Sequence, residues 1–555
     1  MESRRFVLAV ILMIAVIVVT NILFPPVPRQ PAGEAPAAGE PAAADTARPR
    51  SAGPVAGAAP APAVQAPAQA AAPVEGDTVV VASPLYRYAF STLGASLVGA
   101  ELVQFESSTR DGAVQLSSPE IDALLAYGVR IDGQAIDLRR LPFRVDAADT
   151  VWLREGDAPR TLRFVHEDPR GFTVRLTYTF RPDDYVIGVD GAIEGLGGGA
   201  PLLTIDLAPT LASNEANPQE DYRSLSYSVR GERHGIRSTR LDDVSGEVIE
   251  EGPLQWVAIR NKYFLVAAVR GAAEDAAEFG GLIAREVPQE HAADLTATLP
   301  IRRDGRFDFR LYVGPQEYDR LAAINYDLED VNPYGWKIFR PIIGPLAHLV
   351  IWAVVGLHET LNIGYGWVLI LFGVLVRLVL WPLNTRAGRA QMKNMALQPR
   401  IQEIQQKYKN NPERLQQEML KLYREEGFNP LGGCLPMLIP FPVLFTLFFV
   451  FQNTIEFRDV EFLWLPDLSR PDPLYILPIL LGVSIFVMQR VTMKVAPANP
   501  QAKMLTYVMP AVMVVLFFNL ASGLNLYYAA QNVASIPQQL QLARERQRHQ
   551  QGGGR

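Results

Sequence analysis

The feature that most restricts how this chain can fold is a set of apolar runs long enough to cross a lipid bilayer. Residues 6–24 (FVLAVILMIAVIVVTNILF) carry no charge and follow Arg4 and Arg5. At about 1.5 Å per helical residue, such a run spans a hydrocarbon core of roughly 30 Å. A cleaved signal peptide is the alternative, but the run is longer than usual and no A-x-A-like site follows it directly. We therefore interpret residues 1–24 as a transmembrane signal anchor.

More apolar runs lie in the carboxy-terminal part of the chain. We predict membrane spans at residues 363–383, 432–452, 472–490, 503–520 and 523–542. Residues 338–358 precede them and are long enough to span, but Pro341, Pro345 and His348 interrupt the apolar core. These three residues favour a helix that lies along the membrane interface. The predicted fold class is a multi-domain membrane protein, with an all-α polytopic core of five helices plus the N-terminal anchor helix.

Two regions of different composition separate the anchor from these spans. Residues 25–76 consist almost wholly of Ala, Pro and Gly, which bury too little apolar surface to fold, so we predict a disordered linker. Residues 77–330 contain short alternating runs instead. In residues 172–180 (FTVRLTYTF), apolar and polar side chains alternate, as they do in a half-buried strand. We predict a large all-β antiparallel sandwich.

The distribution of charge sets the expected orientation in the membrane. With the amino end in the cytoplasm, the loops at 384–431 and 491–502 and the tail at 543–555 are also cytoplasmic, and all three contain Lys or Arg. The opposite loop, 453–471, contains four acidic and two basic side chains. This asymmetry follows the positive-inside rule. We therefore expect a multi-pass protein of the bacterial inner membrane with its sandwich in the periplasm.

The long basic loop is predicted to form a cytoplasmic helical hairpin at residues 384–428. Apolar residues recur at helical spacing on both sides of Asn411 and Pro412, which are typical of a helix cap and a first helical position. Its basic outer face suits an anionic partner such as a ribosome or lipid head groups, and a solvated loop is the alternative. The candidate docking residues are Arg400, Lys407 and Lys409.

One charged residue, Arg377, lies well inside the first of the carboxy-terminal spans, in the run WVLILFGVLVRLVLWPL at 367–383. A central arginine costs about 2.5–3.5 kcal/mol on an insertion scale, so it is usually kept for a function. No carboxylate lies deep in the predicted spans to pair with it. We predict a water-filled groove that is open to the cytoplasm. Snorkelling of a structural arginine to the inner interface is the alternative.

Polar side chains on two other spans are expected at a depth similar to that of Arg377. The predicted groove residues are Arg377, Ser484, Tyr527, Tyr528, Gln531, Asn532 and Ser535. The groove needs no catalytic group. His166, His234 and His291 are isolated in the sequence and lack the spacing of a metal site. We therefore expect no metal, no cofactor and no enzymatic activity.

Four segments carry a family resemblance. They read VRLVLWPLNTRAGRAQMKNMALQPRIQEIQQKY (376–408), NPLGGCLPMLIPFPVLFTLF (429–448), DLSRPDPLYILPILLGVSIF (467–486) and SGLNLYY (522–528). Together with the order of anchor, sandwich, arginine-bearing span and hairpin, they resemble the YidC membrane protein insertases of Gram-negative bacteria, in the YidC/Oxa/Alb family.

The resemblance implies a function that needs no nucleotide hydrolysis. The chain would insert and fold nascent membrane proteins, alone or beside the Sec translocon, with the ribosome and membrane lipids as further partners and without specific nucleic acid recognition. A polytopic transporter or channel, with Arg377 as a substrate or counter-ion site, is the alternative from another class. Such proteins usually contain inverted repeats and further intramembrane charges, and we find neither in the sequence.

Overall fold

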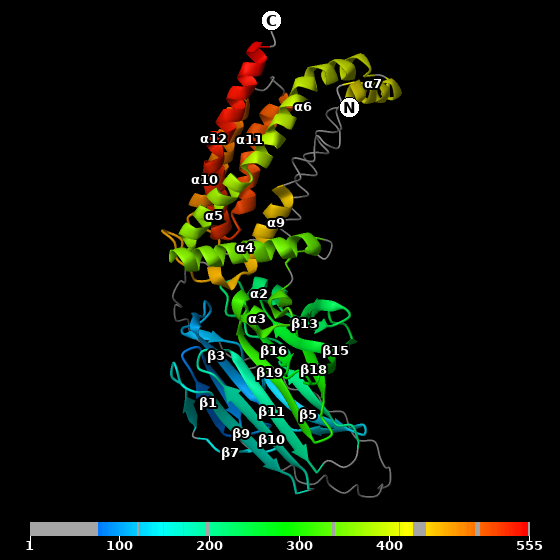
Figure 1. Ribbon diagram of the computed structural model, residues 1–555, viewed down its shortest axis with the longest axis vertical. Coiled ribbons are helices and arrows are strands. Elements are labelled where there is room, and N and C mark those ends of the chain that lie inside the picture. Colours follow the sequence, from blue (N-terminus) through cyan, green and yellow to red (C-terminus); the bar gives the residue numbers. More distant parts are fainter. Residues whose placement is uncertain are drawn as a thin grey trace, which may run out of the picture.

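The computed structural model has a β domain at one end and a group of helices at the other (Figure 1). The described residues are 76–118, 121–147, 149–169, 171–195, 199–332, 334–335, 339–409, 411–425, 440–493 and 500–552. The predicted anchor at 1–24, and all but the last residue of the predicted linker at 25–76, lie outside them.

The β domain forms one sheet of 19 strands. The strands are β1 Thr78–Ala82, β2 Tyr86–Ser91, β3 Leu97–Glu106, β4 Ala113–Gln115, β5 Leu125–Ile131, β6 Gln134–Asp137, β7 Arg144–Val145, β8 Thr150–Trp152, β9 Arg160–Glu167, β10 Thr173–Phe180, β11 Val186–Glu194, β12 Leu202–Leu207, β13 Ser226–Gly231, β14 Gly235–Arg240, β15 Glu247–Arg260, β16 Phe264–Arg270, β17 Phe279–Glu286, β18 Ala293–Pro300 and β19 Arg306–Pro315. Short helices α2 (Pro218–Ser224) and α3 (Tyr318–Ile324) accompany them.

The sheet folds over itself into two layers. One layer follows the order β1, β2, β3, β5, β12, β18, β17, and the other follows β16, β19, β11, β10, β9. The long strand β15 belongs to both, because its first half pairs with β17 and its second half pairs with β16. These pairs are antiparallel, whereas β1 and β8 are parallel. The prediction of a large antiparallel β region is therefore confirmed.

Aromatic side chains fill the space between the two layers. The rings of Phe90 on β2 and Tyr178 on β10 lie 4.6 Å apart. The Tyr178 hydroxyl donates to the Ala95 carbonyl at 2.7 Å and lies 3.0 Å from the Tyr127 hydroxyl of β5. On β10 the buried side chains are Val174, Leu176, Tyr178 and Phe180. The alternation in the sequence thus assigned this face of the strand correctly.

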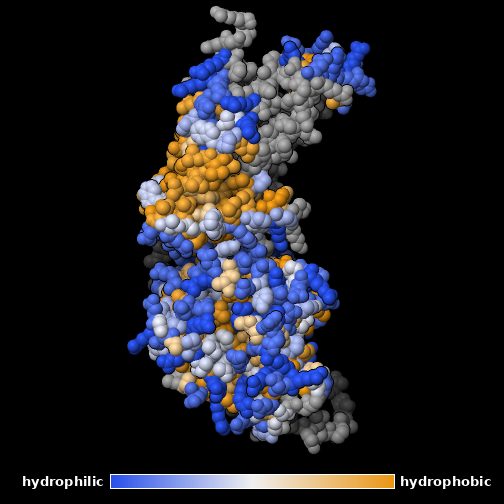
Figure 2. Space-filling model, viewed as in Figure 1, coloured by the Kyte–Doolittle hydropathy of each residue, from blue (hydrophilic) through white to orange (hydrophobic). Residues whose placement is uncertain are grey.

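The helical part contains apolar helices and three helices that are polar on average, α6, α7 and α12. Its elements are α4 Arg340–Leu361, α5 Tyr365–Val379, α6 Trp381–Lys407, α7 Pro412–Glu425, α9 Pro440–Asn453, the 3-10 turn η3 Ile455–Phe457, α10 Ile476–Met493, α11 Pro500–Phe517 and α12 Ser522–Gly552. Helix α4 lies crosswise between the β domain and the ends of the other helices (Figure 1). A band of hydrophobic surface covers this region, while the β domain is largely hydrophilic (Figure 2).

The helix boundaries differ from the predicted spans at two places. Helix α5 ends at Val379 and α6 starts at Trp381, so the predicted span 363–383 is divided. Pro382 explains the break, because it has no N–H to continue the preceding helix and suits a first turn. Helix α12 continues to Gly552, past the expected end of the last span at 542, because its residues 538–551 contain no Gly or Pro.

The number of membrane spans stays a prediction. Among the described residues, α4 alone is long and apolar enough to cross a bilayer, and four shorter apolar helices lie within α5, α9, α10 and α11. The first part of the predicted span 432–452, up to residue 439, lies outside the described residues. The interfacial placement of residues 338–358 likewise stays a prediction.

Helices α6 and α7 form the region where the sequence predicts a helical hairpin. Asn411 accepts a hydrogen bond at 3.1 Å from the Arg414 N–H, and Pro412 is the first residue of α7. The predicted cap is therefore confirmed. The apolar face of α7 is partly covered, since Leu422 is buried. Residues 426–428 of the predicted hairpin lie outside the described residues.

Candidate functional site

Arg377 lies in the last turn of α5, on the side where this helix packs against α12. The two helices pack closely one turn earlier, at Gly373. A Cβ atom there would lie 3.0 Å from the Tyr527 carbonyl oxygen and 3.5 Å from the Ala530 Cβ. Small residues let two membrane helices approach in this way. Since residues four apart share one face of a helix, Arg377 is directed toward α12 as well.

The polar groups around Arg377 are only partly satisfied. Its side chain is half-buried, and its Nε atom has no hydrogen-bond partner among the described residues. Tyr527 of α12 is within electrostatic range of the guanidinium. The buried hydroxyls of Tyr527 and Tyr528 also lack partners in the described part of the chain. An unpaired buried polar group costs about 1–3 kcal/mol, so this site favours water or the polar group of a substrate.

A second polar cluster connects α10 to α12. The Asn532 side-chain amide donates to Ser484 Oγ at 3.0 Å. Ser535 Oγ donates to the Asn532 carbonyl at 2.7 Å and lies 2.8 Å from Met488 Sδ. These groups therefore satisfy one another. Gln531 is half-buried.

The predicted groove residues thus fall into two groups. Arg377 and Tyr527 form one group between α5 and α12, and Ser484, Asn532 and Ser535 form the other between α10 and α12. Tyr528 belongs to neither group, because its ring packs against Phe517 of α11. Within the described residues, no hydrogen bond connects Arg377 to the second group or to Gln531. The expected convergence of all these side chains on Arg377 is not seen in the contacts.

A contact between α12 and α6 was missed in the sequence. Gln538 is 1% exposed and donates to the Trp381 carbonyl at 2.9 Å and to Thr385 Oγ1 at 2.8 Å. Two turns further along α12, Glu545 forms a two-fold ion pair with Arg389, with both distances 3.1 Å. The spacing of these two α12 residues on one helical face was the available signal. These contacts fix the start of α6 against α12.

The candidate docking residues are far from these clusters. Arg400, Lys407 and Lys409 have exposed side chains near the end of α6. The ends of α6 and α7 lie at the opposite end of the molecule from the β domain (Figure 1). The Lys407 ammonium lies 5.5 Å from the centre of the Tyr408 ring. This part of the surface is accessible to a large partner.

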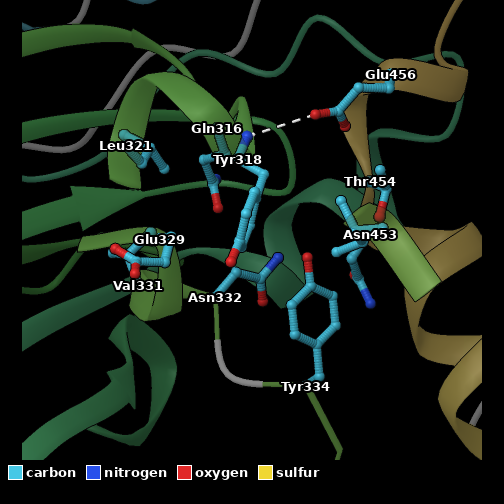
Figure 3. A pocket seen from close by; sticks show the side chains of 11 residues that line it. Gln316, Tyr318, Leu321, Glu329, Val331, Asn332, Tyr334, Asn453, Thr454 and Glu456 are labelled. Carbon is cyan, nitrogen blue, oxygen red and sulfur yellow. Dashed lines mark hydrogen bonds between the residues drawn. The ribbon is translucent and has the colours of Figure 1, made fainter. Parts of the chain in front are cut away.

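A small cavity lies where the β domain meets the helices (Figure 3). Its volume is about 10 Å³, which is near the minimum for one water molecule. It is lined by Gln316, Tyr318, Leu321, Glu329, Val331, Asn332, Tyr334, Ile351, Asn453, Thr454 and Glu456. Glu456 accepts a hydrogen bond at 3.4 Å from the Tyr318 N–H. In the part of the chain that the structure describes, no group of three His, Cys, Asp or Glu side chains is placed to hold a metal ion.

Glu456 is expected to make the stability of this junction depend on pH. Burial raises its pKa to about 7 from an ordinary 4.5, with a further contribution from the charges of Glu317 and Asp319. Between these two pH values the folded chain retains a proton that the unfolded chain loses, so stability falls as the pH rises from 4.5 to 7. Glu456→Gln removes this penalty. Thermal unfolding should show the variant stabilised over the natural chain by about 3 kcal/mol at pH 8, and much less at pH 5.

Glu461→Gln is the matched control, because Glu461 is an exposed carboxylate in the same loop. Its stability relative to the natural chain should be the same at both pH values. An equal effect of Glu456→Gln at pH 5 and pH 8 would contradict the assignment.

The arrangement of a large β domain on a group of apolar helices defines a class of inner-membrane proteins with a periplasmic domain. Two family models match the chain: residues 78–349 match the YidC periplasmic domain, and residues 356–550 match the 60Kd inner membrane protein. The membrane protein insertase YidC of Chlorobaculum tepidum is 32% identical over 505 residues, which cover 83% of this chain and 81% of that protein. The chain belongs to the YidC family of membrane protein insertases.

Other relatives agree with this assignment. The membrane protein insertase YidC of Oleidesulfovibrio alaskensis is 31% identical over 491 residues, covering 85% of this chain and 88% of that protein. A crystal structure of an active YidC insertase with its first transmembrane domain resolved is 20% identical, covers 83% of this chain and 92% of that chain, and has a TM-score of 0.34. The family models and the curated relatives identify the chain as an inner-membrane insertase of membrane proteins, not an enzyme, whose β domain is the periplasmic domain.

Proposed function

We propose that this insertase receives its substrates in a hydrophilic groove that is centred on Arg377 and open to the cytoplasm. The observation that carries the proposal is the half-buried guanidinium of Arg377, whose Nε atom has no partner among the described residues and which lies within electrostatic range of the buried Tyr527 hydroxyl. A positive charge in a wet site attracts acidic or polar groups of an incoming chain. Their path through lipid is thereby shortened.

The apolar part of the substrate then leaves the groove along lipid-facing helices. Helix α9 contains the run LFTLFFVF, and α11 ends in the run VMVVLF; these two runs provide a lipid-like surface. Exposed apolar side chains also occur along α5 and α10. Burial of apolar surface contributes roughly 25 cal/mol per Å², so partitioning into lipid drives release.

The proposal also covers the partners of the protein and its orientation in the membrane. The protein acts alone or with the Sec translocon, and the basic surface of α6 and α7 docks the ribosome or anionic lipid head groups. The amino end is cytoplasmic and the chain crosses the membrane several times. The positive-inside distribution of Lys and Arg supports this orientation.

A reconstituted system tests this function against a transporter or channel. The full chain in liposomes should insert a short membrane protein whose translocated segment is acidic, without added nucleotide. It should not increase the flux of small solutes or ions. Solute flux without insertion would favour a transporter in which Arg377 is a counter-ion site.

The orientation makes a direct prediction for reporter fusions. A reporter enzyme that works only outside the cytoplasm should be active when it is fused after residue 250 and inactive when it is fused after residue 410. A reporter enzyme that works only inside the cytoplasm should give the opposite result. Enzymatic activity of paired periplasmic and cytoplasmic reporters measures both positions. The reverse pattern would place α6 and α7 outside the cytoplasm, where they could not dock a ribosome.

The basic end of α6 should matter for delivery more than for folding. Exposed charges contribute little to stability, so replacing Arg400, Lys407 and Lys409 with Gln should leave the amount of protein unchanged and slow co-translational insertion severalfold. Quantitative blotting and pulse-labelled insertion assays measure these two effects. A parallel loss of protein and of activity would indicate a structural role.

A further inference from the structure

The loop between α9 and α10 joins the two parts of the molecule, and we call its residues 454–470 the connector. Its 3-10 turn contributes one side chain to each hydrophobic core. Ile455, 3% exposed, belongs to the core of the periplasmic domain, and Phe457, 1% exposed, belongs to the core of the helices. A single turn of backbone therefore takes part in both cores.

Arg458 attaches the connector to the periplasmic domain. Its side chain is 1% exposed. Its Nε donates to Glu215 at 2.9 Å and its Nη2 donates to the Glu106 carbonyl at 2.7 Å. The guanidinium carbon also lies 5.6 Å from the centre of the Phe264 ring. A guanidinium holds its five N–H donors in a rigid planar fork, whereas a lysine ammonium is a compact charge with three donors on a flexible stem.

The other end of the connector holds the first residues of α12. The Ser522 N–H donates to the Arg470 carbonyl at 2.7 Å, and the Gly523 N–H donates to the Leu468 carbonyl at 2.9 Å. The Ser522 hydroxyl donates to the Asp467 carbonyl at 2.9 Å. The free N–H groups at the start of a helix are thus satisfied by the connector. The outer end of α12 cannot move without moving the connector.

We infer that Arg458 is a positioning residue: by holding the connector against the periplasmic domain, it fixes α12 and so keeps Tyr527 opposite Arg377. Tyr527 follows Ser522 by little more than one helical turn. A displacement of the start of α12 therefore displaces Tyr527 by a similar distance. The inference rests on the groove proposed above. It assigns to the periplasmic domain a role in setting the geometry of the insertion site.

The distance between α5 and α12 tests this inference without a substrate. Leu371 and Val533 are 37% and 58% exposed on these helices and can carry spin labels as cysteines, once the single native Cys434 is replaced by Ala. In liposomes the otherwise natural chain should give one narrow distance distribution. Arg458→Met should broaden or shift it, and should lower the insertion rate at least about fivefold.

Two further variants make the result decisive. Arg87→Met is the matched control, because Arg87 forms an exposed ion pair with Glu101 in the same domain, and it should change neither distance nor rate. Glu215→Gln removes a charged partner of Arg458 without changing its shape, and serves if Arg458→Met fails to accumulate. An unchanged distance distribution in both Arg458→Met and Glu215→Gln overturns the inference. A changed distance distribution with a normal insertion rate would contradict the groove proposed above, while the link between the periplasmic domain and α12 would stand.

Discussion

Arg377→Leu is expected to slow the insertion of substrates with acidic translocated segments by roughly ten- to a hundredfold, because a hydrogen bond to a charged group is worth about 1.5–3 kcal/mol. The variant should still accumulate in the membrane, since leucine makes α5 easier to insert than arginine does. Arg377→Lys keeps the positive charge on a compact head. It should retain much of the activity.

The measurement is the initial rate of insertion into liposomes that contain equal amounts of each variant. Two substrates that differ only in the acidic residues of the translocated segment should be compared. The loss in Arg377→Leu should be larger for the acidic substrate. If Arg377→Leu inserts both substrates at the normal rate, Arg377 is a structural arginine that snorkels to the interface.

Gly373→Leu is expected to have the other large effect, because α5 and α12 pack closely at Gly373. Even a Cβ atom would lie 3.0 Å from the Tyr527 carbonyl oxygen, and that backbone atom cannot move aside. Overpacking of this kind costs about 1–3 kcal/mol. The helices should separate, with a loss of insertion activity and faster proteolysis in mild detergent.

Gly356→Leu on α4 provides the matched control for this change. A Cβ atom at Gly356 meets no other atom within 4 Å, so leucine fits there without displacing a neighbour. Leucine also has a higher helix propensity than glycine. The control should have normal activity and protease resistance. Equal sensitivity of the two variants would show that helix contact at Gly373 is unimportant.

Local signals in the sequence predicted much of the fold. The alternation of residues 172–180 assigned the buried face of β10, because the period of a strand is independent of its partners. Asn411 and Pro412 placed the start of α7, because capping depends on neighbouring residues alone. By contrast, the pairing of β15 with strands of both layers depends on contacts between distant segments, which no local pattern contains.

The grouping of the polar side chains around Arg377 was predicted less well, because the depth of a residue along a helix does not define the direction in which its side chain points. Tyr527 and Asn532 are five residues apart, so their side chains point about 140° away from each other. The first faces α5 and the second faces α10. Gln538 was missed for a related reason: its partners, Trp381 and Thr385, become its neighbours only after α6 packs against α12.

The buried contacts of Arg458 also constrain the order in which the protein matures during its own synthesis. Every strand of the periplasmic domain ends before residue 316, whereas Glu215 and Arg458 are 243 residues apart in the chain. The domain can therefore complete its strand pairing while the ribosome is still translating α9 to α12. At that stage Glu215 has no buried arginine beside it, and the site of Ile455 in the core is open to water. The connector can close this site only after residues 454–470 have been synthesised, so the junction can form only after the strands of the domain are complete.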